Sequence, residues 1–431
     1  MSRIRGPRLA NRPDRRHRLD VRRRPCSASP DGRRGYGAGV DFDALRRHPD
    51  LEAPGLTAAD AADRLILDES ASALAEVASR PGSVVVIDDA YGALALGAIE
   101  AGASGVRVHQ DPVTGERALA GNAGRLGIAA DERPTSLPLD PGLVADARVV
   151  LMRLPRALDR LDEVAELVAR HAGPGVRVFA GGRVKHMSLA MNDVLARWFA
   201  RVDVTHARQK SRVLVATGPR PDAIASATHW PRAARDEELG LAVVAHGGVF
   251  AGTTVDIGTR FLLGVLGDAV TDAATAVDLA CGSGVVAAWL ARERPGLVVR
   301  ASDRSAAAAA SAPLTAAANG VADRVEVARA DGLEHLPDAS ERLVVLNPPF
   351  HSDAAVHTGI ATHLFAEAAR VLAPGGELWC VWNSHLRYRP LLERLVGPTR
   401  QVARNPKFTV TASVRRAPTR PSWTRDSGDM P

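Results

Sequence analysis

Cysteine is scarce in this sequence, with only Cys26, Cys281 and Cys380 among 431 residues. Their spacing matches no metal-ligand motif, which excludes the usual kinds of zinc site. So few thiols in so long a chain indicate a reducing compartment. We therefore expect a cytoplasmic protein without a bound metal, in which Cys281 is a small buried residue and not a nucleophile.

Long apolar runs are absent as well. None approaches the length of a membrane span, and the N-terminus lacks the apolar core of a signal peptide. Aromatic residues make up 4% of the chain, but 46% of its residues are hydrophobic, which is typical of globular proteins. The composition therefore predicts a globular protein outside the membrane, long enough for two domains of ordinary size.

One motif, Asn347, Pro348, Pro349 and Phe350, ends the short apolar run at 343–346. Two prolines cannot continue a strand, so the backbone turns and presents Asn347 at the strand's carboxyl edge, where open α/β sheets bind ligands. The Asn347 side-chain oxygen and the Pro348 carbonyl could each accept one hydrogen of a conjugated amine such as guanine N2 or adenine N6. That would aim the nitrogen lone pair at an electrophile while Phe350 stacks on the base. The simpler interpretation is a turn that only ends a strand.

A tight turn follows an earlier strand, at 277–279, and opens a helix at 285–292. Small residues in this turn would let a ligand touch the backbone. The candidates for cofactor contact in this segment are Asp278, Ala280, Gly282 and Gly284. A glycine-rich turn of this kind would by itself be a weak dinucleotide fingerprint.

Two further strands also end in carboxylates. The strand at 298–302 leads to Asp303, which can accept both hydroxyls of a ribose, and a helix at 305–319 follows. The strand at 325–327 leads to Asp331, placed to contact an adenine edge. With the turn after 277–279 and with Asn347, four successive strand ends each carry residues that could contact a ligand. This ordered series is more specific than any one of them.

Residues 248–412 resemble a class I S-adenosylmethionine-dependent methyltransferase, and specifically the ribosomal RNA guanine-N2 methyltransferases of the RsmC/RlmG group. The segments that carry the match are 248–250, 256–263, 278–284, 347–351, 383–388 and 407–410. The resemblance implies S-adenosylmethionine as cofactor, a guanine N2 amine as target, and Thr259 and Arg260 near the methionine end of the cofactor. The large-subunit enzymes are the more similar ones. The family usually has glycine where this chain has Ala280, and a methyl group is tolerated at the start of the turn if that residue keeps a negative φ.

An internal repeat organises the first half of the chain. Residues 84–89 resemble the strand at 277, and 147–151 match 342–346. Where the second copy has Asn347 and its neighbours, the first has Met152, Arg153, Leu154 and Pro155, which offer no amide to an amine. Its turn at 89–93 contains the bulky Tyr91 and a single glycine, so we expect this copy to bind no S-adenosylmethionine.

The repeat predicts an α/β fold with two tandem doubly wound Rossmann-like methyltransferase domains. The degenerate domain is placed at 41–240 and the catalytic domain at 241–415. The Arg-rich residues 1–40 are expected to be disordered and 416–431 to be a flexible tail. Residues 1–34 carry a net charge of +9, so the remainder is slightly acidic. The Arg-rich start is either an RNA-gripping arm or an upstream stretch wrongly included in the reading frame.

Lysine is rare, with three among the 55 Lys and Arg residues, but two of the three fall in a basic stretch at 176–212. The candidate RNA contacts there are Arg183, Lys185, Arg197, Arg201, Arg208, Lys210 and Arg212. Their charge in an otherwise acidic half favours phosphate binding. The alternative is an amphipathic helix at 189–199 with a solvated basic face, and for Trp198 and Phe199 we expect core positions.

We therefore expect a monomeric, cytoplasmic enzyme that methylates a guanine in ribosomal RNA or in a ribosomal subunit. Methylation of adenine N6 or of a protein glutamine amide is an alternative, because the amine-gripping chemistry is the same. A nicotinamide-dependent oxidoreductase would not need Asn347 and its prolines at the fourth strand. In a noncatalytic RNA-binding module, both copies should have decayed, and only one has.

Overall fold

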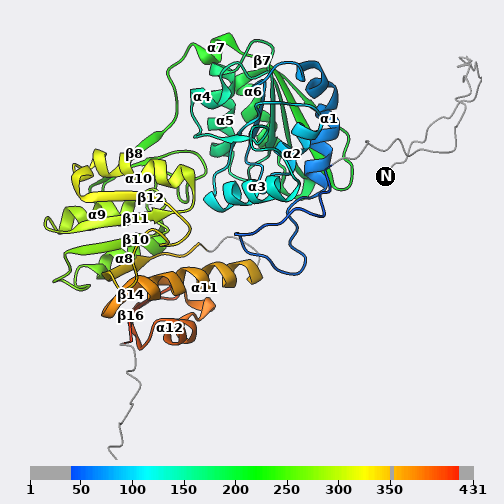
Figure 1. The fold of residues 1–431 in the computed structure, drawn as a ribbon. Helices are drawn as coiled ribbons and strands as arrows, with labels where there is room; N and C mark the ends of the chain where they lie inside the picture. Colours follow the sequence, from blue (N-terminus) through cyan, green and yellow to red (C-terminus); the bar gives the residue numbers. More distant parts are fainter. Residues whose placement is uncertain (1–39, 350–353, 417–431) are drawn as a thin grey trace, which may run out of the picture. The chain divides into compact units, whose positions relative to one another are not determined.

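The two halves of the chain contain sheets with the same strand order. The computed structural model describes residues 40–349 and 354–416, which belong to one compact unit. Within these residues, one seven-stranded sheet has the order β3-β2-β1-β4-β5-β7-β6 and the other the order β12-β11-β10-β13-β14-β16-β15 (Figure 1). In each sheet β7 or β16 runs antiparallel to both its neighbours, and the remaining pairs are parallel. The predicted tandem doubly wound fold is confirmed.

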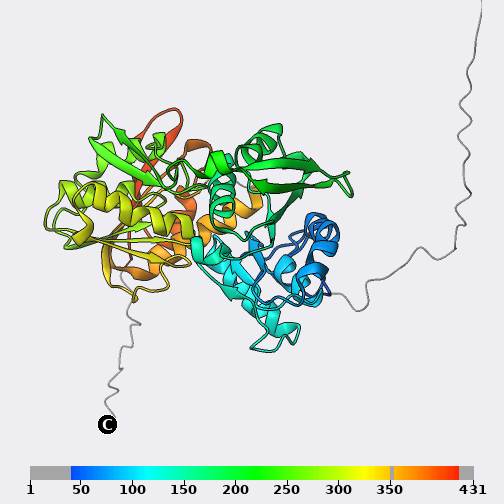
Figure 2. The same cartoon turned by 90° about the horizontal axis from the view of Figure 1, so that it is seen from above.

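The first copy and the segment after it contain these elements: α1 (Ala61–Val77), β1 (Val84–Ile87), α2 (Ala93–Glu100), β2 (Arg107–His109), α3 (Val113–Arg125), β3 (Thr135–Ser136), α4 (Pro141–Val144), β4 (Val149–Arg153), α5 (Leu158–His171), β5 (Arg177–Arg183), η1 (Val184–His186), α6 (Leu189–Trp198), β6 (Phe199–Val204), β7 (Ser211–Pro219) and α7 (Pro221–Ile224). The long strands of the β6–β7 hairpin are drawn in green in Figure 2.

The second copy contains α8 (Ile257–Leu266), β10 (Thr275–Leu279), α9 (Val285–Glu293), β11 (Val298–Asp303), α10 (Ala306–Ala318), η2 (Ala322–Arg324), β12 (Val325–Arg329), β13 (Glu341–Leu346), α11 (Ala354–Val371), β14 (Leu372–Asn383), η3 (Ser384–Leu386), α12 (Arg389–Leu395), β15 (Thr399–Arg404) and β16 (Phe408–Val414). A hairpin of β8 (Arg232–Asp236) and β9 (Leu241–Ala245) precedes it. The predicted domain boundary after residue 240 falls in the turn of this hairpin, and Leu241 and Val243 belong to the core of the second copy.

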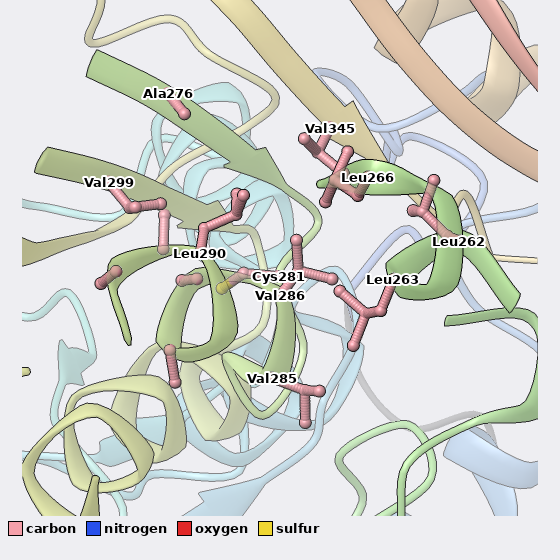
Figure 3. Packing of buried hydrophobic residues seen from close by; sticks show 14 of the residues in the cluster. Leu262, Leu263, Leu266, Ala276, Cys281, Val285, Val286, Leu290, Val299 and Val345 are labelled. Atoms are coloured by element: carbon pink, nitrogen blue, oxygen red, sulfur yellow. The ribbon is translucent and has the colours of Figure 1, made fainter. Parts of the chain in front are cut away.

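Both sheets are covered by helices on both faces, which explains why their central strands are continuous apolar runs. In β13, Val345 packs with α8, α9 and α10, whereas Val344 packs with α11 and α12. Figure 3 shows the first of these layers, with the leucines of α8 gathered near Val345 and the start of α9. This double cover leaves the ends of the strands as the places where a ligand can reach the sheet.

Residues 1–39 and 417–431 lie outside the described part of the chain, as does Phe350. The predictions made for both tails and for stacking by Phe350 therefore concern residues that the structure does not describe.

Candidate active site

A cavity of about 630 Å³ lies at the carboxyl ends of the strands of the second sheet. The four predicted strand ends meet there, together with the segment that leads into α8 and five residues of the first copy. Its lining includes Asp278, Ala280, Gly282, Asp303, Asp331, Asn347, Pro348, Pro349, Thr259, Asp256, Gly248, His363, Asp50, Asp111 and Pro112. Gly284 and Arg260 are predicted site residues that do not line it.

Asn347 follows the last residue of β13 and is held by the N-terminus of α8. Its Nδ2 donates to Thr259 Oγ1 at 2.9 Å and to Asp256 Oδ2 at 3.3 Å. A carboxylate oxygen can only accept, so the amide NH2 group must face Asp256 and the amide oxygen must face away. That oxygen, Oδ1, is buried and has no hydrogen-bond partner among the described residues. A buried acceptor left unpaired costs about 1 to 3 kcal/mol, which a ligand donor would recover.

Asp256 was not among the predicted site residues, although it begins the segment 256–263 that carries part of the resemblance. It is the N-cap of α8, and its Oδ2 also accepts from the backbone N–H groups of Gly258 and Thr259 at 2.8 and 3.1 Å. A helix N-cap and the orientation of Asn347 therefore depend on one carboxylate. The signal in the sequence is an Asp immediately before a helix start, which by itself predicts only a cap.

Arg260 is directed away from the cavity, contrary to its expected place beside the cofactor. Its guanidinium pairs with Asp236 and with Glu238, the latter at 2.7 Å. Consecutive residues of a helix point about 100° apart, so Thr259 and Arg260 cannot both face the same side. Of the two, only Thr259 lies in the site.

The turn between β10 and α9 has alternating left-handed residues, with φ of 57° at Ala280, 55° at Gly282 and 78° at Gly284. Ala280 does not keep the negative φ under which its methyl group would be tolerated without strain, because the chain passes from β10 into α9 through a left-handed residue at that point. Gly284 is required for packing, since a Cβ there would lie 2.7 Å from the Cβ of Ala312. It shapes the turn without lining the cavity.

Asp303 is anchored in a way that leaves its carboxylate at the cavity wall. Its Oδ2 accepts from the Gly282 N–H at 3.0 Å and its Oδ1 from the Ser305 N–H at 2.9 Å. Burial raises the pKa of this carboxyl above its usual value. Each oxygen keeps a second lone pair, so a pair of ribose hydroxyls could be accepted in this position.

Asp278, which was expected to contact the cofactor, also stabilises the turn. Its Oδ2 accepts from the Ala287 N–H at 2.9 Å, which ties the end of β10 to the first turn of α9. Burial raises the pKa of Asp278 to about 7. The residue therefore stabilises the turn and lines the cavity at the same time.

Asp331 forms a pair with His363 of α11, a residue that no sequence motif singled out. Asp331 Oδ1 and His363 Nε2 are 3.2 Å apart. This hydrogen bond lowers the pKa of Asp331 and raises the pKa of His363. The pairing holds an ionised acceptor at the third strand end, in the position expected to face an adenine edge.

Cys281 is buried beside the same turn, within the cluster drawn in Figure 3. Burial raises the pKa of its thiol well above the usual value, so the thiol stays protonated. This is the behaviour of a small core residue, as expected. In the described part of the chain, no group of three or more His, Cys, Asp or Glu is placed to bind a metal ion. None of the helices described is both long and apolar enough to cross a membrane.

The first copy contains the same site with different residues. The first left-handed residue of each turn, Asp88 or Ala280, aligns the two copies and makes Val86 equivalent to Asp278. Val86 pairs with Leu151 and Asp278 pairs with Val345, so Leu151 is equivalent to Val345. Two residues further on, Arg153 and not Met152 therefore occupies the position of Asn347. The sequence comparison of the two copies was therefore off by one residue at this strand end.

Arg153 contacts Asp60 and Asp63 at 3.3 and 3.4 Å, and these two occupy the N-cap and N3 positions of α1. Asp256 and Thr259 have the same places on α8. An ion triad thus replaces the Asn–Asp–Thr arrangement, and a guanidinium has no acceptor for an amine. The degenerate copy lacks the feature that distinguishes the second.

The residues predicted to contact RNA differ in their ion pairing and in their exposure. Arg197, Arg201 and Arg208 each pair with a carboxylate, namely Asp162 at 3.3 Å, Asp203 at 2.7 Å, and both Asp68 at 3.2 Å and Glu69 at 3.1 Å. Lys185 and Lys210 are exposed and form no ion pair within the described residues, whereas Arg183 and Arg212 are partly buried. Trp198 and Phe199 are core residues with 4% and 1% exposure, as expected.

Lys210 and Lys407 occupy the same corner of the two copies. The Val184 N–H donates to the Lys210 carbonyl, and the Ser384 N–H donates to the Lys407 carbonyl, both at 2.9 Å. Each lysine precedes the first residue of an antiparallel strand that pairs with the end of β5 or β14. The carboxyl edge of both sheets therefore presents an exposed ammonium at this corner.

Comparison with known proteins agrees with the resemblance seen in the sequence. Residues 240–412 match the methyltransferase small domain, and residues 40–220 match the RLMG N-terminal domain. Ribosomal RNA large subunit methyltransferase G of Pseudomonas syringae pv. tomato is 34% identical over 366 residues, covering 85% of this chain and 96% of that protein. The protein of the same name from Streptomyces avermitilis is 34% identical over 389 residues, with coverages of 86% and 97%.

Among solved structures, a T. thermophilus 16S rRNA N2 methyltransferase, RsmC, in complex with AdoMet and guanosine, has a TM-score of 0.64. It is 22% identical and covers 85% of this chain and 97% of that chain, which shows a shared fold. The matches to both halves and the identities to the curated relatives lead to one conclusion. The chain belongs to the ribosomal RNA large subunit methyltransferase G family.

Proposed function

We propose that this protein is an S-adenosylmethionine-dependent methyltransferase that modifies the exocyclic N2 amine of a guanine in ribosomal RNA of the large subunit. The names of the curated relatives support the RNA and the subunit. The name of the RsmC structure, and its AdoMet and guanosine, accord with N2 chemistry on this fold. We further propose that the enzyme acts as a cytoplasmic monomer, with ribosomal RNA or a ribosomal subunit as its partner.

The observation that carries the proposal is the unpaired Oδ1 of Asn347 at the wall of the cavity. The guanine N2 lone pair is delocalised into the ring, which makes the amine a poor nucleophile. If Asn347 Oδ1 and the Pro348 carbonyl accept its two hydrogens, the nitrogen becomes tetrahedral and the lone pair is freed. Asp256 and Thr259 fix the amide beforehand, so no reorganisation is needed during the reaction.

The residues that line the cavity fit the parts of S-adenosylmethionine, which when bound supplies a methyl group on a sulfonium sulfur. We assign Asp303 to the ribose hydroxyls, Asp331 to the adenine edge and Thr259 to the wall near the methionine end. Asp278, Ala280, Gly282 and Gly284 build the turn against which the cofactor lies. The amine attacks the methyl carbon, the carbon–sulfur bond breaks with its electron pair going to sulfur, and the amine then releases one proton.

The alternatives differ in what they ask of the site. Adenine N6 and a glutamine amide would use the same acceptors, and the names of the relatives favour guanine in rRNA over both. A nicotinamide-dependent oxidoreductase has no use for an unpaired acceptor at Asn347. For RNA contact we propose Arg183, Lys185, Arg197, Arg201, Arg208, Lys210 and Arg212, of which the two unpaired lysines are the strongest candidates.

Replacing Asn347 by alanine tests the mechanism. We expect the methyl-transfer rate to fall by roughly 100-fold or more, because a preorganised transition-state acceptor is removed. S-Adenosylmethionine affinity should stay near the wild-type value, which calorimetry can verify. The measurement is single-turnover transfer from labelled cofactor to rRNA from a deletion strain, followed by mass analysis of the modified nucleoside. A wild-type rate in N347A would contradict the mechanism, and methyl groups on adenine would contradict the proposed target.

A matched pair of variants separates acceptor chemistry from simple disruption. N347D places a carboxylate oxygen where Nδ2 now donates to Asp256, so the two charges repel. Adding D256N reverses the polarity of that contact and keeps an N-cap residue on α8. We expect N347D/D256N to transfer methyl groups roughly tenfold faster than N347D. The repulsion between two adjacent carboxylates that the second substitution removes corresponds to about one pKa unit, and one pKa unit is equivalent to a factor of about ten. Equal rates would show that Asp256 does not orient residue 347.

A further inference from the structure

Two equivalent loops of the two copies meet and exchange hydrogen bonds. In the first copy the loop lies between β2 and α3, and in the second it lies between β11 and α10. The Val113 N–H donates to the Arg304 carbonyl at 2.9 Å, and the Ala306 N–H donates to the Asp111 carbonyl at 2.7 Å. Each helix thus has its first backbone N–H satisfied by the opposite copy.

The side chain of Asp111 extends this contact into α10. Its Oδ1 accepts from the Ala307 N–H at 3.0 Å and from Ser305 Oγ at 2.9 Å. Ser305 Oγ in turn accepts from the Ala308 N–H at 3.1 Å. The first N–H groups of a helix have no partner within it, so two of these three in α10 depend on a residue of the degenerate copy.

The capped segment is the one that carries Asp303. Asp303 Oδ1 accepts from the Ser305 N–H, so the position of the carboxylate depends on the conformation that Asp111 fixes at Ser305. Asp111 and Pro112 also line the cavity themselves. Because Asp303 faces the same cavity, a shift of this loop would alter the cofactor pocket directly.

A second connection starts from the residue that makes the first copy degenerate. The Tyr91 hydroxyl donates to Asp50 Oδ2 at 2.6 Å, and Arg304 donates to Asp50 Oδ1 at 3.3 Å. Tyr91 has the place in its turn that Ser283 has in the second copy, one residue before the left-handed glycine. The turn that no longer suits a cofactor therefore supports Arg304, the neighbour of Asp303.

We propose that the degenerate copy is a working part of the cofactor site, and that Asp111 is a positioning residue that holds residues 303–306 in the conformation that binds S-adenosylmethionine. This inference rests on the proposed function only in that the cofactor is S-adenosylmethionine. Asp111 need not touch the cofactor to act. Its effect passes through Ser305 to Asp303.

Calorimetry with S-adenosylmethionine on the full chain tests the inference. D111A should weaken cofactor affinity by about 5- to 30-fold, since it removes two hydrogen bonds that fix the loop. D111N keeps an oxygen acceptor and should stay within about threefold of wild type. The single-turnover rate of D111A at saturating cofactor should fall by a smaller factor than its cofactor affinity, a split that a general loss of structure would not give. If D111A does not fold, D111Q, which displaces the acceptor by one methylene, should show the weakened binding.

The control is E116A, which removes the 2.7 Å ion pair between Glu116 and Arg329 at the same contact but leaves residues 303–306 untouched. We expect it to bind the cofactor like wild type. Wild-type affinity in D111A, or equal reductions in D111A and E116A, would overturn the inference. A wild-type chain that binds S-adenosylmethionine but methylates no rRNA would contradict the proposed function and leave this inference intact.

Discussion

Single residues in the cofactor turn carry conformational strain that the second copy tolerates. Ala280 has a φ of 57°, and the equivalent residue of the first copy, Asp88, has the same φ. Aspartate enters the left-handed region more readily than alanine, for which it costs about 1 to 2 kcal/mol. The first copy therefore has the better-suited residue at this point, although it is the copy that has Arg153 in the position of Asn347.

Replacing Ala280 by glycine should raise the free energy of unfolding by about 0.5 to 1 kcal/mol, because glycine adopts a positive φ without a Cβ clash but is freer in the unfolded chain. Urea denaturation of the purified protein measures this. The control is A310G, at an exposed position in the middle of α10, where glycine should destabilise by about 1 kcal/mol. If both variants change stability in the same direction, the strain assigned to Ala280 is absent.

At the scale of elements, the ends of the strands could be predicted from the sequence, but the directions in which individual side chains point could not. Asp303 and Asn347 follow apolar runs, so their place at the carboxyl edge follows from the pattern alone. The sign of φ at Ala280 depends on how β10 joins α9, and the choice between Thr259 and Arg260 depends on where α8 begins. The one-residue error at Arg153 arose because β4 has no glycine or Asn-Pro-Pro motif to mark where the strand ends. The role of Asp111 depends on the packing of two distant segments, which no local pattern encodes.

The turn after β5 and the hairpin β6–β7 contain Lys185 and Lys210, the two exposed lysines that we propose to contact RNA. K185E/K210E should weaken rRNA binding and lower the slope of log affinity against log salt by roughly 0.7 to 0.9 for each phosphate that the variant no longer neutralises. R208E should have a smaller effect, since Arg208 already pairs with Asp68 and Glu69 of α1. Filter binding at several salt concentrations distinguishes these outcomes, with S-adenosylmethionine affinity as the check on folding. If R208E reduces the slope as much as the lysine pair does, the ion pairs do not withhold Arg208 from RNA.

For the whole molecule, the two copies each have a buried aspartate beside the turn that follows their central strand, Asp89 after β1 and Asp278 at the end of β10. Burial raises the pKa of Asp89 and of Asp278 to about 7. Between roughly pH 4 and 7 the folded protein then binds more protons than the unfolded chain, so these groups make stability fall as pH rises through that window.

D278N should flatten this dependence, because an amide keeps an oxygen for the Ala287 N–H and has no proton to lose. The free energy of unfolding of D278N, relative to wild type, should rise between pH 4.5 and 7 by at most about 1.4 kcal/mol per pH unit. Denaturation curves at several pH values measure the difference. A difference between the two proteins that does not change with pH would show that Asp278 titrates near its ordinary value.

The exchanged caps between α3 and α10 have a consequence for recombination between related genes. A substitution at Asp111 can remove the hydrogen-bond acceptor of the Ala307 N–H, which lies 196 residues further along the chain. Recombination that joins the first half of one such gene to the second half of a distant relative would bring together loops that never changed in concert. Such chimaeras are expected to bind the cofactor only when both loops come from the same parent.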